Sequence, residues 1–316
     1  MTVVKRVSQS IFGLFLFAAV VAQWTLSHLV FLGPWSKKEK QAAAARIVGF
    51  CLRVCFTLHP FIRVTPADGW EKLPQSAIVV MNHISFLDGL VVAGLIPLSV
   101  IGRSRALLKA GLMKYPLFGT VCRMIGHFPV HFTSKNMGDF SVDKEKQAKV
   151  MEGVHQHLTD GGVLFIFPEG QVNAAPPALQ VFRRGSFGVV IDQKRPLWGL
   201  AIKGCEDVWP FGTAFGGFPG TIEMKLFPIA TGEEVATMEI AALCDLAQNK
   251  MQAQLDLLYT TTPKPVVTSP QALSVAGKAA PATSAAGSQS PPKKNGGPGA
   301  GVAKRTQGRR NSRSGS

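Results

Sequence analysis

His83 and Asp88 are the residues whose types and spacing could carry out acid–base chemistry. They lie in residues 82–88, which read Asn-His-Ile-Ser-Phe-Leu-Asp. A carboxylate bonded to one imidazole nitrogen fixes the tautomer and leaves the other nitrogen free as a base. The competing interpretation is a capped turn with a surface histidine, and on this stretch alone the two are equally well supported.

A strand and a helix must position this pair. Residues 77–81 are short, apolar and β-branched and end at polar residues, which predicts a buried strand. Ser85 is placed to cap the amino end of a helix that begins near Phe86, with Asp88 in its first turn. His83 then lies at the mouth of the strand, and Asp88 reaches back towards it.

A second predicted strand, residues 163–167, leads into a second acidic residue, Glu169, and its neighbour Gly170. Ligands of open α/β sheets gather outside the strand ends. No serine or cysteine nucleophile accompanies the histidine, so the pair suggests a base that activates an alcohol of the substrate. Basic residues nearby in sequence suggest that this substrate carries a phosphate; they are Arg103, Lys109, Arg183 and Arg184.

Alternating strands and helices predict an α/β domain from about residue 61 to 260, with a mixed sheet flanked by helices. The predicted strands cover residues 62–65, 77–81, 100–102, 163–167, 197–202 and, at an edge of the sheet, 221–227. The predicted helices cover residues 87–96, 142–159, 182–192 and 233–259.

The first 60 residues are expected to attach the chain to a membrane. Residues 11–32 hold no charged side chain and are long enough for one span, which takes about 20 residues. A signal peptide and a buried core helix are weaker alternatives. Residues 41–61 contain Arg46 and Arg53, which favours an interfacial helix. Cys51 and Cys55 lie one turn apart in this helix. They could carry palmitate, but we expect them to be small apolar packing residues.

Composition limits the class of protein. The chain has 316 residues, 46% of them hydrophobic, and a net charge of +15. Residues 261–316 hold nine of the cations and no acidic residue, leaving +6 on the rest. We expect this segment to be a disordered basic tail and expect no nucleic-acid partner. The five scattered cysteines argue against disulfides and zinc, and no metal site is expected.

Together with these features, the motifs of the chain resemble those of the glycerolipid acyltransferases, the 1-acyl-glycerol-3-phosphate acyltransferase family. The motifs, in order, are Asn82-His83-x4-Asp88, Lys109-Ala-Gly-Leu, Tyr115-Pro-Leu-Phe-Gly119, Phe167-Pro168-Glu169-Gly170 and Phe182-Arg183-Arg184-Gly185-Ser186-Phe187. Each motif alone is weak evidence, whereas the ordered set over residues 75–205 is specific.

Three positions depart from the family pattern. Phe132 stands where the second motif ends in arginine, residues 171–173 read Gln-Val-Asn in place of Thr-Arg-Ser, and Gly199 replaces a second proline. The missing arginines bear on phosphate binding. His127, His131 and Lys135 could compensate, although we expect the two histidines to fill a loop.

The resemblance implies a membrane-bound enzyme that transfers an acyl chain from acyl-CoA, a co-substrate, to lysophosphatidic acid, with no cofactor. His83 would be the base and Asp88 its orienting partner. Glu169 and Gly170 would lie at the acceptor, with oxyanion donors near Gly170, and the four basic residues would bind the phosphate. The family implies the endoplasmic reticulum and a cytosolic-facing site. The alternatives are another lysophospholipid or glycerol-3-phosphate as acceptor, or a non-catalytic lipid-binding protein.

Overall fold

The computed structural model describes residues 2–133 and 141–261. Met1–Lys264 form one compact unit. The tail predicted for residues 261–316 lies outside the described residues, apart from Thr261. The helix α2 (Lys37–Leu58) is followed by the strand β1 (Ile62–Thr65), and the domain boundary expected near residue 60 stays a prediction.

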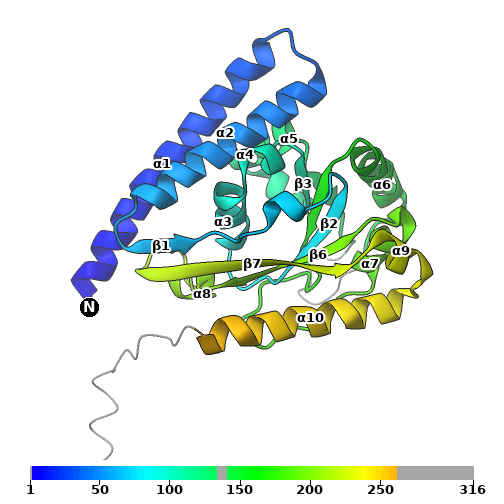
Figure 1. Cartoon of the computed structure of the whole chain (residues 1–316). Coiled ribbons are helices and arrows are strands. Elements are labelled where there is room, and N and C mark those ends of the chain that lie inside the picture. The colour runs from blue at the N-terminus through cyan, green and yellow to red at the C-terminus, as the bar shows by residue number, and fades with distance from the viewer. Residues whose placement is uncertain (1, 134–140, 262–316) are drawn as a thin grey trace, which may run out of the picture. The chain divides into compact units, whose positions relative to one another are not determined.

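The described residues form one seven-stranded mixed sheet in the order β1-β7-β6-β2-β5-β3-β4 (Figure 1). The remaining strands are β2 (Ala77–Met81), β3 (Ser104–Lys109), β4 (Phe128–Val130), β5 (Val163–Ile166), β6 (Leu197–Lys203) and β7 (Gly220–Ala230). The five strands from β6 to β4 are parallel, whereas β7 is antiparallel to β6 and parallel to β1. This confirms the predicted α/β fold with a mixed sheet.

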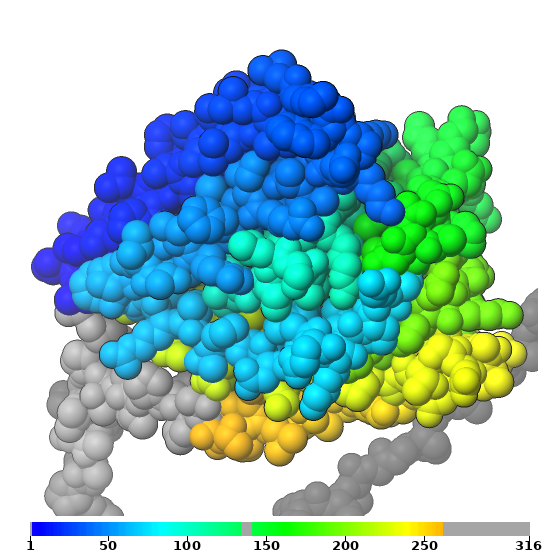
Figure 2. Space-filling view, turned by 45° about the horizontal axis from the view of Figure 1, so that its top comes forward, coloured from blue at the N-terminus to red at the C-terminus, as the bar shows by residue number. Residues whose placement is uncertain are grey.

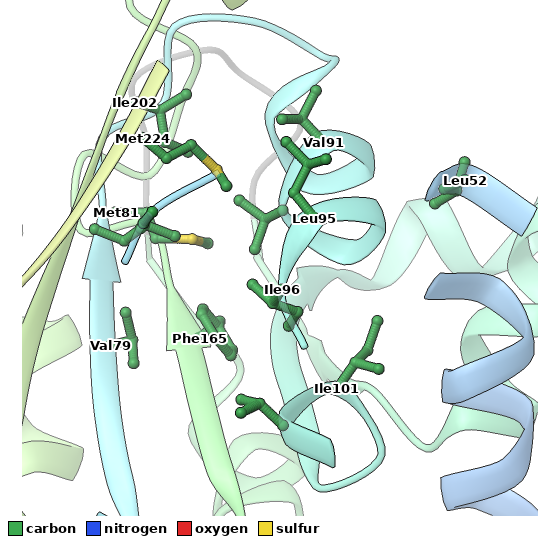
Figure 3. Packing of buried hydrophobic residues seen from close by; sticks show 14 of the residues in the cluster. Leu52, Val79, Met81, Val91, Leu95, Ile96, Ile101, Phe165, Ile202 and Met224 are labelled. Atoms are coloured by element: carbon green, nitrogen blue, oxygen red, sulfur yellow. The ribbon is translucent and has the colours of Figure 1, made fainter. Parts of the chain in front are cut away.

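Helices cover both faces of this sheet, which explains why β2 is apolar at every position. Val79 and Met81 point into a core shared with α2, α3 (Asp88–Leu95), α4 (Leu98–Ile101) and α5 (Phe118–Ile125) (Figure 3). Ile78 and Val80 point into the opposite core, against α6 (Lys144–Thr159), α7 (Gly185–Gln193), α9 (Gly232–Thr237) and α10 (Ile240–Thr261). A strand buried on both faces has no polar alternation.

The helix α2 belongs to the first of these cores. Its Leu52 and Phe56 are fully buried. Gly94 of α3 lets the two helices touch, because a Cβ there would lie 3.1 Å from the Leu52 backbone. Arg53 donates to the carbonyls of Gly94 and Ile96 at 3.0 and 2.7 Å, at the carboxyl end of α3. A cation is favourable there because helix carbonyls are otherwise unpaired.

The helix α1 (Thr2–Leu32) packs along α2 (Figure 2). Near its start, the Ser8 hydroxyl donates to the Gly217 carbonyl at 2.6 Å, and Phe12 is fully buried. Its opposite side exposes apolar side chains at Leu14, Phe17, Leu29 and Leu32. Both α1 and α2 are long and apolar enough to cross a membrane, by length and composition.

Three expectations about the elements were wrong. Residues 100–102 end the short helix α4, and the strand begins two residues later at Ser104. The strand β7 lies between β1 and β6, so it is not at an edge. The closing helix is divided into α9 and α10. Thr231 begins α9 with a capping box, and Met238 ends it in extended backbone.

Candidate active site

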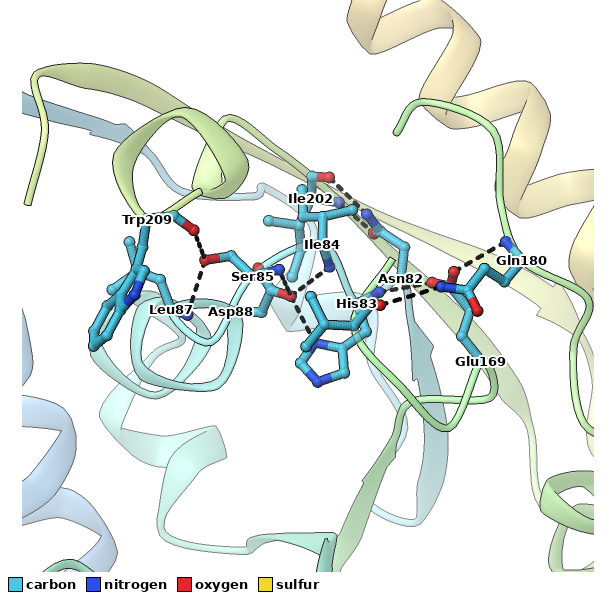
Figure 4. Close-up of polar contacts among 11 residues, drawn as sticks. Asn82, His83, Ile84, Ser85, Leu87, Asp88, Glu169, Gln180, Ile202 and Trp209 are labelled. Atoms are coloured by element: carbon cyan, nitrogen blue, oxygen red, sulfur yellow. Dashed lines mark hydrogen bonds and ion pairs between the residues drawn. The ribbon is translucent and has the colours of Figure 1, made fainter. Parts of the chain in front are cut away.

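The turn after β2 holds the predicted catalytic pair at the carboxyl edge of the parallel strands (Figure 4). Asn82 is fully buried and forms two hydrogen bonds with Ile202 of β6: its amide nitrogen donates to the Ile202 carbonyl, and its amide oxygen accepts the Ile202 N–H, both at 2.8 Å. The asparagine thereby extends the pairing of β2 with β6 by one residue. The backbone after it is fixed for His83.

His83 and Asp88 meet as predicted. His83 Nδ1 lies 2.9 Å from Asp88 Oδ2, and that oxygen also accepts the N–H groups of Ile84 and Ser85 at 2.8 and 2.9 Å. The helix α3 begins at Asp88, two residues later than expected, and Ser85 does not cap it. Because Asp88 only accepts, Nδ1 carries the proton and Nε2 keeps its lone pair. The pair is therefore arranged as a general base.

The imidazole is held by its surroundings. Asp88 is fully buried, whereas the His83 side chain is 21% exposed, so the ring is open to a substrate on one side. The Phe167 ring stacks on the imidazole with a centroid distance of 4.2 Å. Phe167 directly follows β5, the neighbour of β2 in the sheet. Sequence reasoning missed this contact, since nothing in the pattern separates a stacking phenylalanine from a core one.

Glu169 is fully buried beside the pair. One carboxylate oxygen accepts the His83 backbone N–H at 2.8 Å, and the other accepts the Gln180 N–H at 3.0 Å. Burial raises the pKa of Glu169, and these two hydrogen bonds oppose that shift. The carboxylate therefore holds two loops of the site together. Its predicted contact with the acceptor stays a prediction.

Gly170 adopts φ +73°, which favours glycine, and closes the turn after β5. Its N–H donates to the Phe167 carbonyl at 3.1 Å. This N–H is therefore engaged within the turn, and the oxyanion donors expected near Gly170 stay a prediction.

Three of the four predicted phosphate-binding cations lie at the carboxyl edge. Lys109 is exposed at the end of β3, and Arg184 is exposed at the start of α7. Arg183 is half-buried, with Nε 3.4 Å from the Glu169 carbonyl. Arg103 is not with them: its carbonyl accepts the N–H of Val163, at the opposite end of β5. Lys109 lies six positions further along the strand, about 20 Å away.

His127 does not replace the missing arginine. Its Nδ1 accepts the Ala106 N–H at 3.0 Å, and burial, with help from Arg105 and His157, lowers its pKa to about 3. A neutral imidazole cannot bind phosphate as a cation, so the expectation that His127 fills a loop fits this geometry. His131 is half-buried beside β4, and Lys135 lies outside the described residues.

The two half-buried histidines, His127 and His157, predict acid sensitivity. Burial and then Arg105 lower the pKa of His157 to about 4. Both histidines titrate near 6.5 when unfolded, so the unfolded chain binds more protons between about pH 4 and 6.5, and stability falls as pH falls through that window. Each histidine should cost about 2 kcal/mol between pH 7 and 5. We expect His157→Gln to reduce the dependence of the unfolding free energy on pH, measured by chemical denaturation at several pH values. His155 is exposed on the same helix, so His155→Gln should leave this dependence unchanged.

Comparison with known proteins agrees with this geometry. Residues 66–203, which hold the His83–Asp88 pair and Glu169, match the family model described as Acyltransferase. The match covers somewhat less than half of the chain. It confirms the resemblance that the ordered motifs predict. The His83–Asp88 pair and Glu169 are the candidate site of the matched segment.

Two named relatives of this chain are distant. A 1-acyl-sn-glycerol-3-phosphate acyltransferase of Chlamydomonas reinhardtii is 24% identical over 65% of this chain and 56% of its own length. The alpha 1-acyl-sn-glycerol-3-phosphate acyltransferase of Mus musculus is 25% identical over 56% of this chain and 58% of its own length. The matched part thus spans little more than half of each relative.

A solved structure has the same fold. The crystal structure of the 1-acyl-sn-glycerophosphate (LPA) acyltransferase PlsC from Thermotoga maritima superposes with a TM-score of 0.66. The match covers 83% of this chain and 99% of that one, at 16% sequence identity. At that identity the likeness concerns the fold.

Proposed function

We propose that this chain is a membrane-bound 1-acyl-sn-glycerol-3-phosphate O-acyltransferase, which moves an acyl chain from acyl-CoA to the free hydroxyl of lysophosphatidic acid. The product is phosphatidic acid, in phospholipid biosynthesis. The observation that carries the proposal is the 2.9 Å contact of His83 Nδ1 with the buried Asp88. The pair lies at the carboxyl edge of the parallel strands, where β3 ends at Lys109 and α7 begins after Arg184. The names of the distant relatives support the choice of substrates.

The base acts on an acceptor that is itself the nucleophile. His83 Nε2 removes the hydroxyl proton as the oxygen attacks the thioester carbonyl, and Asp88 stabilises the imidazolium that forms. The tetrahedral intermediate collapses with loss of the CoA thiolate, which takes the proton from Nε2. The ester bond forms, the thioester bond breaks, and the base returns to its starting state. Because the thioester is already activated, no acyl-enzyme is required.

Arg184 is the sharpest test of phosphate binding. We expect Arg184→Ala to raise the KM for lysophosphatidic acid about tenfold while changing the KM for acyl-CoA less than twofold, because a charge-assisted hydrogen bond is worth about 1.5–3 kcal/mol. Steady-state kinetics with each substrate varied would measure this. Lys149→Ala, an exposed cation on α6, should change neither KM. Equal effects of Arg184→Ala on both KM values would contradict the phosphate role.

The substitutions at Phe132 and residues 171–173 favour a second candidate acceptor. They remove two arginines that the family pattern places at the phosphate, while Gln171 and Gln180 bond to each other at 2.6 Å in that loop. Another lysophospholipid, or glycerol-3-phosphate, is then the acceptor. A screen of purified protein with labelled acyl-CoA and each acceptor decides between them. Liposome binding with no turnover on any acceptor would favour the non-catalytic lipid-binding alternative.

We propose that α1 and α2 hold the domain on the bilayer. The outward side chains Leu14, Phe17, Leu29 and Leu32 of α1 are 58–83% exposed, and such apolar exposure suits a lipid environment. Acyl-CoA as donor would set the site on the cytosolic side, and the family resemblance favours the endoplasmic reticulum. Flotation of the full chain with liposomes tests the attachment. Replacing Leu14 and Phe17 together by Ser should reduce flotation, and recovery unchanged from wild type would contradict it.

A further inference from the structure

The hydroxyl of Ser85 links the turn that holds the catalytic pair to a distant part of the chain. We call this turn, residues 82–88, the catalytic turn. The Ser85 hydroxyl donates to the Trp209 carbonyl at 2.7 Å and accepts the Leu87 N–H at 3.1 Å (Figure 4). The Ser85 backbone N–H donates to Asp88 Oδ2 at 2.9 Å. Ser85 is fully buried, and it therefore joins the orienting carboxylate to Trp209 without competition from bulk water.

Trp209 begins a loop that is closed on itself. It follows the short helix α8 (Cys205–Val208), and we call residues 209–219, which lead to β7, the α8–β7 loop. Near the end of this loop, the Gly217 N–H donates to the Val208 carbonyl at 2.8 Å. The two ends of the loop are therefore fastened together, and Gly217 lies close to the residue that Ser85 bonds.

The start of α1 is bonded to the same loop. The Ser8 hydroxyl donates to the Gly217 carbonyl at 2.6 Å, and this bond is buried. One turn later, the fully buried Phe12 lies edge-on to the Trp209 ring, with centroids 6.3 Å apart, and tilted against the Phe215 ring at 5.7 Å. The contact is close, since a Cβ at Gly217 would lie 2.5 Å from Phe12 Cβ. The first turns of α1 therefore hold the loop to which Ser85 is bonded.

These contacts are more than attachment to a bilayer requires. The exposed side chains of α1, among them Leu14 and Phe17, already supply an apolar face for lipid. A tether does not need a buried hydroxyl bonded into the loop beside the catalytic turn. A buried polar bond of this kind fixes one arrangement of two segments and adds no apolar area. The bond of Ser8 therefore calls for an explanation other than attachment.

We propose that the first turns of α1, residues 8–12, position the catalytic turn through the α8–β7 loop, with Ser85 as the positioning residue that receives this support. General-base catalysis depends on placement, and a displacement of about 1 Å can lower a rate about 10²-fold. The proposal rests on the proposed function, because it concerns the same base. A row of contacts does not by itself transmit an effect, so the test measures the coupling between its two ends.

A double-mutant cycle tests this coupling in the full chain, with kcat measured on liposomes. Ser85→Ala removes the bond to Trp209, keeps the backbone N–H that Asp88 accepts, and should lower kcat about tenfold. Ser8→Ala removes the support of the loop and should lower kcat about threefold. Because Ser8 acts through Ser85, the double variant should lose about tenfold, whereas independent sites would lose about thirtyfold. Both KM values should stay within about twofold of wild type, since no substrate-binding group changes.

Ser76→Ala is the matched control. The Ser76 hydroxyl also donates to a backbone carbonyl at 2.7 Å, that of Leu158, but Ser76 precedes β2, whereas the catalytic turn follows it. This variant should leave kcat unchanged. A loss of about thirtyfold in the double variant, or a wild-type rate in Ser8→Ala, overturns the proposal and leaves α1 as an anchor. A wild-type protein without acyltransferase activity would instead refute the proposed function.

Hydrogen exchange tests the link independently of activity. The amides of Ile84 and Ser85 are protected by their bonds to Asp88. Ser8→Ala should speed exchange in the catalytic turn about fivefold, whereas Ser76→Ala should leave it unchanged. Exchange there that does not respond to Ser8→Ala would overturn the proposal, whatever the activity of the wild type.

Discussion

Replacing His83 by Ala should lower kcat by about 10²–10⁴-fold, the usual worth of a positioned general base. The fold should survive, because the imidazole makes one hydrogen bond, to Asp88, and is partly exposed. The backbone N–H of residue 83 still donates to Glu169 in the variant, since alanine keeps it. The KM values should change little, because no binding group has been removed. Initial rates with purified protein and labelled acyl-CoA measure the loss.

His155→Ala is the control for this variant, since His155 is an exposed histidine on α6. It should retain the wild-type rate. Equal turnover of His83→Ala and wild type would remove His83 from the chemistry. A rate lost together with the folded structure, seen by circular dichroism, would show that the residue supports the fold and would contradict our account of the loop.

Asp88→Asn should lower kcat by about 10- to 10³-fold while leaving the fold intact. The charge of the carboxylate stabilises the imidazolium that forms during the reaction, and the amide has no charge to offer. The amide oxygen can replace Oδ2 and accept the N–H groups of Ile84 and Ser85, and the amide NH₂ can occupy the place of Oδ1, where no N–H or O–H of the described residues competes. The variant therefore isolates the charge.

Asp88→Ala is the informative companion of Asp88→Asn. It leaves the N–H groups of Ile84 and Ser85 buried without an acceptor, so it should lower the free energy of unfolding by about 2–4 kcal/mol as well as kcat. Chemical denaturation of both variants measures the difference. If the asparagine variant were as unstable as the alanine one, or as active as wild type, the role given to the Asp88 charge would be wrong.

Much of the fold could be predicted because the strands carry strong local signals. The bounds of β1 and β2 agree with the prediction, since both runs end at clear turn or polar residues. The alternating pattern of β7 does not reveal its place in the sheet, because an edge strand and a strand that lies between two others can both alternate. The α4 region is ambiguous for a related reason. Three of residues 98–101 are apolar, and a short buried helix and a short strand can have the same composition.

The site was predictable where the chemistry is local. His83 and Asp88 are five residues apart, so one turn brings them together. Arg103 is close to Lys109 in sequence but not in space. The strand β3 runs between them and places the two residues at its opposite ends. The two hydrogen bonds of the Asn82 side chain with Ile202 join residues 120 positions apart, and only the pairing of β2 with β6 creates them.

One measurement tests the central claim most directly. Purified protein is given labelled acyl-CoA with and without lysophosphatidic acid, and free CoA thiol and diacyl product are counted together in wild type and His83→Ala. We predict one thiol released per diacyl product, release that depends on the acceptor, no label left on the protein, and loss of both products in the variant. A folded wild-type protein that acylates no lysophospholipid and no glycerol-3-phosphate, or a variant that matches it, would contradict the account.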